Sequence, residues 1–480
     1  MLDSNYPLLI AGSPKASGTR KVTAPYDGRE LADIDTADAA AHESALAAAY
    51  QRYRQRDAWL SVDQRVKILD RAADIMTAIA EELAVGAAEE GGKPLTDSRV
   101  EVARAIDGLR LCIETIRSDQ GYVVPVAGTP AGANRLAFTQ REPVGVVVAV
   151  SAFNHPLNLI VHQVGAAVAA GCPVIVKPAD DTPLSCIRFV RVLHEAGLPL
   201  DYCQVAISED LAAAEALVTD HRVGFFSFIG SARVGWMLRS KLSPGTRCAL
   251  EHGGAAPLIL AEDANVDAAL ASVMKGGFYH AGQVCVSVQR VFAERSIARE
   301  FAERLAAGAK DLKVGDPTLA DTEIGPLIRH AEVKRVAEWV DEAVANGTER
   351  LCGGAPLSAS LYPCTVLWDP ADSERVSREE VFGPVVCVYP YDSMDDAIER
   401  ANALPVAFQA AVFTKSTDTA LRAFKRLDAS AVMVNDHTAF RVDGMPFAGL
   451  RQSGLGVGGI GHTIADMSVE KMMVIKSDEL

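Results

Sequence analysis

The chain has 480 residues, more than a single hydrophobic core usually organises, so two or three domains are expected. Apolar residues make up 49% of it and charged residues 23%, proportions typical of an ordinary globular protein. The formal charge of −15 is spread along the chain without a basic block, which argues against nucleic acid as a partner.

The cysteines and the first residues bear on the cellular compartment. The nine cysteines are dispersed and never form a CxxC pair, which is typical of neither a disulfide framework nor a zinc site. The first residues lack the basic and then apolar layout of a secretion signal. The longest apolar stretch, roughly 164–176, is too short to cross a membrane. We therefore expect a cytoplasmic protein with reduced thiols that binds neither a metal nor a membrane.

Short strands and turns are expected over residues 1–36, and helices follow. Ser61 and Gln64 form a capping-box pattern, which predicts a helix running from there towards residues 91–92. A further helix is expected from about Thr96, because the apolar positions 102, 106, 109 and 113 repeat on one face. Arg104 lies off this apolar face.

The next part of the chain changes composition and then alternates between strands and helices. Residues 120–142 are rich in Gly, Pro and Thr, which suggests an excursion of extended chain. Short continuous apolar runs then predict strands covered on both faces: 146–150, 174–177, 204–207, 224–228 and 258–261. Helical stretches lie between most of these runs, so they indicate an α/β fold with a doubly wound parallel sheet.

A second alternation of strands and helices begins after Glu251. Strands are expected near 286–293, 384–390 and 409–413, and helices at about 297–310 and 330–346. The final segment, roughly 460–480, contains residues 470–476, which can form a strand.

Two loops at predicted strand ends carry residues suited to a cofactor. Gly230 and Ser231 follow a strand and precede a helix, where free backbone N–H groups favour a phosphate. The spacing to Gly235 is Gly-x4-Gly, so it matches the usual dinucleotide fingerprint only in part. Lys177 and Asp180 follow another strand and can bind ribose hydroxyls. Each pattern alone also fits an ordinary turn or a charged loop.

Three further residues have the chemistry of an acyl-transfer site. Cys285 follows Gly-Gln and can act as a nucleophile, and Glu251 before a Gly pair can act as its base. Asn154 follows a strand, and its side-chain amide is a suitable neutral donor for a developing oxyanion. In isolation, a buried structural cysteine and two turn residues are the ordinary alternatives.

Taken in chain order, these motifs resemble the aldehyde dehydrogenase superfamily over essentially the whole chain. The matching segments are Phe-Asn-His-Pro at 153–156, Lys-Pro-Ala at 177–179, the Gly-Ser turn at 230–235, Glu-x-Gly-Gly at 251–254, Gly-Gln-x-Cys at 282–285, Glu-Val-Phe-Gly-Pro at 380–384, and Pro-Phe-Ala-Gly with Ser-Gly-x-Gly at 446–456. The resemblance implies a Rossmann-like cofactor domain (1–119 and 143–252), an α/β catalytic domain (253–459) and a small β oligomerisation arm (120–142 and 460–480). A homodimer or homotetramer is expected from this arm.

The resemblance also implies a role for each matching residue. Cys285 is expected to be the nucleophile, Asn154 with the Cys285 backbone N–H the oxyanion hole, and Glu251 the base that activates the deacylating water. A small aldehyde would then become a carboxylate through a thiohemiacetal and a thioester, with hydride passing to oxidised nicotinamide. The cofactor contacts expected are Lys177, Asp180, Gly230, Ser231, Gly235, Glu380 and Phe382.

The chain departs from the common pattern of the superfamily at three positions. His155 stands where an aromatic residue is usual, His252 where Leu is usual, and Gly458 where many members have Glu. Because that second acid is missing, Glu251 is the one strong candidate for the base.

A few positions in the sequence restrict the range of possible substrates. The chain resembles most the branch with lactaldehyde, succinate-semialdehyde and phosphonoacetaldehyde dehydrogenases, whose acid-handling members hold the anionic end with arginines matching Arg104 and Arg441. We expect a short acidic aldehyde bound by these two arginines, with His155 lining the pocket. Val284 stands where phosphonoacetaldehyde enzymes carry Arg, which favours succinate semialdehyde.

Several alternatives stay open. Asp180 would repel a 2′-phosphate, which favours NAD, but it is one carbon shorter than the usual Glu and so leaves room for NADP. The two arginines could instead pair at the surface with Glu101 or Asp443. Lactaldehyde, phosphonoacetaldehyde or another small aldehyde are alternative substrates. A thiol-dependent esterase, a coenzyme A-acylating dehydrogenase and a non-catalytic binding protein are alternatives of other classes.

Overall fold

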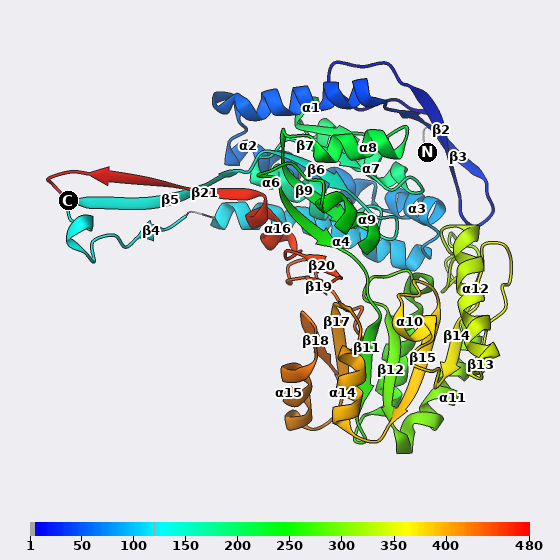
Figure 1. Cartoon of the computed structure of the whole chain (residues 1–480). Helices are drawn as coiled ribbons and strands as arrows, with labels where there is room; N and C mark the ends of the chain where they lie inside the picture. Colours follow the sequence, from blue (N-terminus) through cyan, green and yellow to red (C-terminus); the bar gives the residue numbers. More distant parts are fainter. Residues whose placement is uncertain (1–4, 120) are drawn as a thin grey trace.

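The computed structural model describes residues 5–119 and 121–480. The first four residues of the expected cofactor domain and residue 120 of the expected arm lie outside the described residues. Two large sheets, each with its own helices, lie one above the other in Figure 1, and a narrow arm projects from the upper half.

The first sheet has six strands in the order β20-β10-β9-β6-β7-β8. They are β6 (Val146–Val150), β7 (Val174–Lys177), β8 (Cys203–Val205), β9 (Val223–Ile229), β10 (Arg247–Glu251) and β20 (Gly454–Leu455). All neighbours are parallel except β20, which pairs antiparallel with β10. Val147 and Ala149 of β6 enter one hydrophobic cluster, and Val146 and Val148 enter another. The strand is therefore apolar throughout because both of its faces are covered.

The helices of this half confirm some expected features and correct one. They are α1 (Ala39–Arg54), α2 (Val62–Ala78), α3 (Ala80–Gly91), α4 (Leu95–Ser118), α5 (Asn158–Ile160), α6 (Ala166–Ala170), α7 (Pro183–Glu195), α8 (Leu211–Thr219), α9 (Ala232–Arg239) and α16 (Ile460–Asp466). The capping box is formed, because Gln64 N–H donates to Ser61 Oγ at 3.2 Å and Ser61 N–H donates to Gln64 Oε1 at 2.8 Å. The single helix predicted up to residues 91–92 is wrong, because the chain leaves helical geometry at Ile79, between α2 and α3.

The apolar face predicted for the helix after Thr96 is present on α4. Positions 102, 106, 109 and 113 are all buried, and Arg104 lies away from them, half-buried. Between α5 and α6 the chain makes a π-helical turn, Val161–Gly165, so the two short helices form one continuous buried segment.

The second sheet has seven strands in the order β13-β14-β15-β12-β11-β17-β18. They are β11 (Ala256–Leu260), β12 (Val288–Glu294), β13 (Glu349–Cys352), β14 (Thr365–Trp368), β15 (Val385–Tyr391), β17 (Gln409–Phe413) and β18 (Ala431–Val434). Only β13 runs antiparallel to its neighbour. The apolar run expected at 258–261 forms β11 in this sheet.

The helices around the second sheet lie close to the predicted positions. They are α10 (Val266–Phe278), α11 (Arg295–Asp311), α12 (His330–Ala345), α13 (Arg375–Arg378), α14 (Met394–Asn402) and α15 (Thr417–Arg426). The helices expected at 297–310 and 330–346 correspond to α11 and α12.

The arm consists of extended chain from two distant parts of the sequence. β21 (Ser468–Lys476) pairs antiparallel with β5 (Arg135–Pro143), and β4 (Val123–Val124) adds a third strand. Figure 1 shows this ribbon projecting from the body with the C-terminus at its tip. The expected extended excursion and C-terminal strand are therefore present.

Two small sheets complete the structure. β1 (Asn5–Tyr6), β2 (Gly18–Thr23) and β3 (Glu30–Thr36) form one, and β16 (Val406–Ala407) and β19 (Leu450–Arg451) form the other. Among the described residues, no helix combines the length and apolar character needed to span a membrane.

Candidate active site

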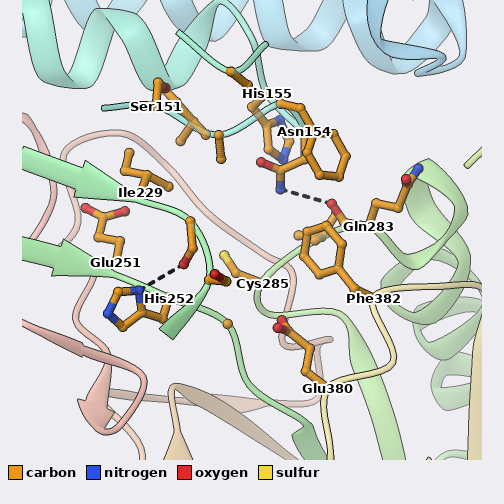
Figure 2. Close-up of a pocket in the computed structure, with 18 of the residues that line it drawn as sticks. Ser151, Asn154, His155, Ile229, Glu251, His252, Gln283, Cys285, Glu380 and Phe382 are labelled. Atoms are coloured by element: carbon orange, nitrogen blue, oxygen red, sulfur yellow. Dashed lines mark hydrogen bonds between the residues drawn. The ribbon is translucent and has the colours of Figure 1, made fainter. Parts of the chain in front are cut away.

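A cavity of about 740 Å³ lies where the two halves of the molecule meet. Its walls come from the segments at the carboxyl ends of β6, β9 and β10 and from loops of the second half (Figure 2). Most of the predicted site residues line it: Arg104, Asn154, His155, Gly230, Ser231, Glu251, Cys285, Glu380, Phe382 and Arg441. Lys177, Asp180 and Gly235 lie outside this lining.

Cys285 follows a turn with an unusual backbone. Three successive residues of this turn are left-handed: His280 (φ 49°), Ala281 (φ 54°) and Gly282 (φ 70°). Side chains with a Cβ disfavour this region, and a Cβ on Gly282 would overlap a carbonyl oxygen of the neighbouring loop. The glycine of the Gly-Gln-x-Cys segment is therefore required by the path of the backbone that leads to Cys285.

Two buried side chains tie the Cys285 loop to its surroundings. The Gln283 amide donates to two backbone carbonyls and accepts the Ile328 N–H at 2.9 Å. Asn154 Nδ2 in turn donates to the Gln283 carbonyl at 2.9 Å (Figure 2). The Asn154 amide is therefore fixed beside the loop that carries Cys285, with a second N–H still available.

The electrostatic surroundings of Cys285 and Glu251 favour their neutral forms. Burial raises the pKa of the Cys285 thiol to about 12; the Arg441 cation opposes this shift, and Glu251 and Glu380 reinforce it. Burial also raises the pKa of Glu251, again against the effect of Arg441. A carboxylate with a raised pKa is a stronger base near neutral pH. Gly458 gives this carboxyl group its space, because a Cβ there would overlap Glu251 Oε1.

The turn between β9 and α9 is held by a histidine. His252 Nδ1 donates to the Gly230 carbonyl at 2.9 Å (Figure 2), and Ser231 stands directly before α9. A Cβ on Gly235 would overlap the His252 ring. Gly235 thus provides space for the histidine that replaces the usual Leu, and its position is explained by packing without a ligand.

Lys177 and Asp180 contact each other at the end of β7. Lys177 Nζ donates to Asp180 Oδ1 at 3.0 Å, and Arg20 from β2 lies 2.8 Å from the same oxygen. Burial alone would raise the pKa of Asp180, but the two cations lower it below its ordinary value. The negative charge expected to repel a 2′-phosphate is therefore compensated on two sides. Arg20 was missed by the sequence analysis, because nothing in the β2 sequence indicates a partner so distant in the chain.

Glu380 and Phe382 form the part of the wall contributed by the second half. Glu380 Oε1 accepts the Gly254 N–H at 3.1 Å, and burial raises the pKa of its carboxyl to about 8. A Cβ on Gly253 would overlap this carboxyl group, so the Gly pair after Glu251 makes room for it. Phe382 has a left-handed backbone (φ 45°).

The two predicted substrate arginines differ in their surroundings. Arg104 makes a bidentate pair with Asp443, at 3.0 and 2.8 Å, so the alternative pairing with Asp443 does occur, and Asp443 is buried. Arg441 instead lies over the Phe447 ring, 3.6 Å from its centroid. Its Nε and Nη2 are buried and have no hydrogen-bond partner among the described residues. Of the two, Arg441 is the cation available to a ligand.

A buried ion pair behind His155 also escaped the sequence analysis. Lys93 and Glu101 are 1% and 0% exposed at their side chains, and Lys93 contacts His155. Charged residues are almost never this buried unless they are paired. Glu101 shares its side of α4 with the buried positions Ala105 and Cys112, so its place among apolar residues was a detectable signal.

Comparison with known proteins places the chain in one family. It matches the model of the aldehyde dehydrogenase family over residues 13–473. It is 36% identical over 471 residues to a 3-sulfolactaldehyde dehydrogenase of Priestia aryabhattai, and the match covers 98% of each chain.

Solved structures agree with this match. Aldehyde dehydrogenase 21 from Physcomitrella patens, solved in complex with the reaction product succinate, is 30% identical, with a TM-score of 0.94 over 99% of each chain. An NADP-dependent glyceraldehyde-3-phosphate dehydrogenase from Bacillus halodurans, solved with NADP, is 28% identical, with a TM-score of 0.95 over 99% of this chain and 100% of that one. The expected fold is confirmed, and the chain belongs to the aldehyde dehydrogenase family, oxidoreductases that act on an aldehyde group.

Proposed function

We propose that the protein oxidises a short aldehyde with an anionic group at its far end to the corresponding carboxylate, with NAD or NADP as the hydride acceptor. One observation carries this proposal: Cys285, Asn154 and Glu251 share a cavity with the unpartnered cation of Arg441. Succinate semialdehyde fits this description. Two relatives support an acidic substrate. The Priestia protein is named for 3-sulfolactaldehyde, an aldehyde with a sulfonate group, and the Physcomitrella structure contains the product succinate.

The cavity wall fits a nicotinamide dinucleotide. The turn at Gly230 and Ser231 presents the first backbone N–H groups of α9, which suit a phosphate. Gly253 leaves room for the Glu380 carboxyl group in the cavity wall, where this group can form hydrogen bonds with ribose hydroxyls. When bound, the oxidised nicotinamide supplies the acceptor for a hydride.

The surroundings of Asp180 suit both forms of the cofactor. Its carboxylate favours the free 2′-hydroxyl of NAD, whereas the adjoining cations of Lys177 and Arg20 can attract the 2′-phosphate of NADP. NAD stays the favoured cofactor in this proposal. A comparison of kcat/KM for NAD and NADP decides between them.

The residues of the cavity can carry the remaining steps. The Cys285 thiol releases its proton to water, the Arg441 cation favours the resulting thiolate, and the thiolate attacks the carbonyl carbon to form a thiohemiacetal. The oxyanion accepts hydrogen bonds from Asn154 and from the Cys285 backbone N–H. Loss of hydride from this carbon leaves a thioester. Glu251 then takes a proton from the attacking water, and cleavage of the C–S bond releases the carboxylate and the cysteine.

The role of Arg441 can be tested by enzyme kinetics. Arg441→Ala is expected to raise the KM for succinate semialdehyde about 10-fold to 100-fold, the effect of one charge-assisted hydrogen bond, while the KM for propionaldehyde changes little. Absorbance of reduced nicotinamide measures both reactions.

Two controls accompany this measurement. Arg233→Ala removes an exposed arginine at the same cavity, so it should leave the selectivity between the two aldehydes unchanged. Cys285→Ala should abolish turnover. Equal KM changes for both aldehydes in Arg441→Ala would contradict the anion-binding role, and ester hydrolysis without nicotinamide as the sole activity would contradict the proposed reaction.

A further inference from the structure

A buried ion pair lies directly behind the cavity wall at His155. Lys93 Nζ contacts Glu101 Oε2 and lies 2.7 Å from His155 Nδ1. Glu101 Oε1 accepts two backbone N–H groups, from Leu157 at 2.9 Å and from Asn158 at 3.0 Å. Burial lowers the pKa of Lys93, and the adjacent Glu101 carboxylate opposes this shift and so favours the ammonium ion.

This arrangement determines which nitrogen of His155 carries the proton. An ammonium group has three donors and no acceptor, so the nitrogen that it contacts must supply a lone pair. His155 Nδ1 is therefore the acceptor, and in the neutral ring the proton is on Nε2. The ring is neutral because burial, and then the cations of Lys93, Arg104 and Arg441, lower the pKa of His155 well below its ordinary value.

The Nε2 of His155 is left as a donor without a partner. His155 lines the cavity, and Nε2 makes no hydrogen bond within residues 5–119 and 121–480. An acceptor atom of a substrate in the cavity can pair with this donor.

We propose that His155 donates from Nε2 to a hydroxyl oxygen on the carbon next to the aldehyde, and that Lys93 is the positioning residue that holds the ring in this tautomer. His155 directly follows Asn154, the proposed oxyanion donor, and both residues line the cavity. Arg441 takes the acidic far end. The substrate class is therefore a 2-hydroxyaldehyde with an anionic group, an inference that builds on the function proposed above.

Two matched substrates test the role of His155. They are succinate semialdehyde and its derivative with a hydroxyl group on the carbon next to the aldehyde. The wild-type protein should prefer the hydroxy compound about 2-fold to 10-fold in kcat/KM, the effect of one hydrogen bond between neutral groups. His155→Phe should bring the ratio close to one. His155→Gln, whose amide N–H2 can occupy the place of Nε2–H, should retain much of the preference.

The kinetic results can contradict the role of His155 without contradicting the proposed acidic substrate, and the reverse. Equal kcat/KM for the two compounds in the wild-type protein, or an unchanged preference in His155→Phe, would overturn the inference. Failure to oxidise either compound, in a preparation that oxidises neutral aldehydes, would instead overturn the proposed acidic substrate.

The positioning role of Lys93 needs a variant that leaves no unpaired buried charge. Lys93→Met with Glu101→Gln removes both charges and keeps an oxygen for the two backbone N–H groups. The preference ratio should fall towards one although His155 is present. A purely structural role would reduce kcat for both substrates alike and leave the ratio unchanged, which would overturn the assignment.

A direct measurement covers the case in which the double variant does not fold. Nitrogen-15 spectra of wild-type protein labelled at histidine should contain an unprotonated Nδ1 signal that disappears in His155→Gln. A protonated Nδ1 at His155 would overturn the proposed tautomer.

Discussion

Arg441 also affects the nucleophile, because its charge opposes the burial that raises the pKa of the Cys285 thiol to about 12. In the protein without cofactor, labelling of Cys285 by iodoacetamide should therefore rise about tenfold per pH unit from pH 7 to 9 without a plateau, since the thiolate fraction is still small. Arg441→Ala should slow the labelling at every pH, because the thiol loses a stabilising cation. Mass spectrometry of the cysteine peptides measures both rates.

An internal reference is available for this experiment. Cys248 is the other cysteine that is only partly buried among those described, and it lies outside the cavity lining. Its labelling should not respond to Arg441→Ala. A plateau of Cys285 labelling near pH 8.5 would show that burial does not control the thiol.

Gly458 offers a second test at the level of one residue. In Gly458→Ala the new methyl group would overlap Glu251 Oε1, and the flexible end of the glutamate can move away at little cost to stability. The displaced carboxyl should then activate water poorly, so that steady-state kcat falls at least tenfold, the lower range for a general base. A rapid burst of about one reduced nicotinamide per site should persist, because thioester formation precedes the step that is impaired.

Gly461→Ala is the matched control for this prediction. A Cβ at Gly461 would find its nearest neighbour, Thr115 Oγ1, at 3.9 Å, so kcat should be unchanged. A Gly458→Ala variant with the wild-type steady-state rate would show that the observed position of Glu251 is not the one used in catalysis.

Among the elements, α2 depends on its capping box. Ser61→Ala removes the oxygen that accepts the Gln64 N–H, so the free energy of unfolding should fall by about 1 kcal/mol. The shift of the urea unfolding midpoint measures this loss. Ser44→Ala on α1 is the control, because the Ser44 hydroxyl only donates to the exposed Ala40 carbonyl of its own helix and caps nothing. Equal shifts in the two variants would contradict the capping role.

Elements that depend on neighbouring residues could be predicted, and those that depend on distant contacts could not. The capping box and the apolar face of α4 are local patterns. The break between α2 and α3 occurs at Ile79 (φ −112°, ψ 21°), where no Gly or Pro in the sequence indicates it.

In the candidate site, too, local sequence motifs could be predicted and long-range contacts could not. Residues that stand in recognisable segments, such as Cys285 and Glu251, were placed in the cavity by resemblance. The pairing of Arg104 with Asp443 spans 339 positions, and no local pattern indicates which of two arginines would be neutralised. The difference between Arg104 and Arg441 therefore became visible only in three dimensions.

At the scale of the whole molecule, the cavity exists because the chain crosses twice between its halves. It leaves the first sheet after Glu251 and returns as β20, whose Gly454 pairs with Glu251 itself. The proposed base is thus held at the junction of the two halves, beside the loops that contribute Arg441 and the cofactor wall. β20 belongs by position to the expected catalytic segment and by pairing to the first sheet.

We expect the protein to assemble into a dimer or tetramer through β21, the edge strand of the arm. This strand pairs with β5 on one edge only, and it exposes Met473 and Ile475, 56% and 39% accessible, on the same face. An open strand edge with exposed apolar side chains favours pairing with another chain, and lysines on such a strand oppose it. Met473→Lys with Ile475→Lys should therefore convert the assembly into monomers, as measured by light scattering during gel filtration. Lys476→Ala, which keeps the apolar face, should leave the mass unchanged. If the double variant kept the mass of the wild-type assembly, or if the wild-type protein were itself a monomer at micromolar concentration, the arm would not have the role expected from the sequence.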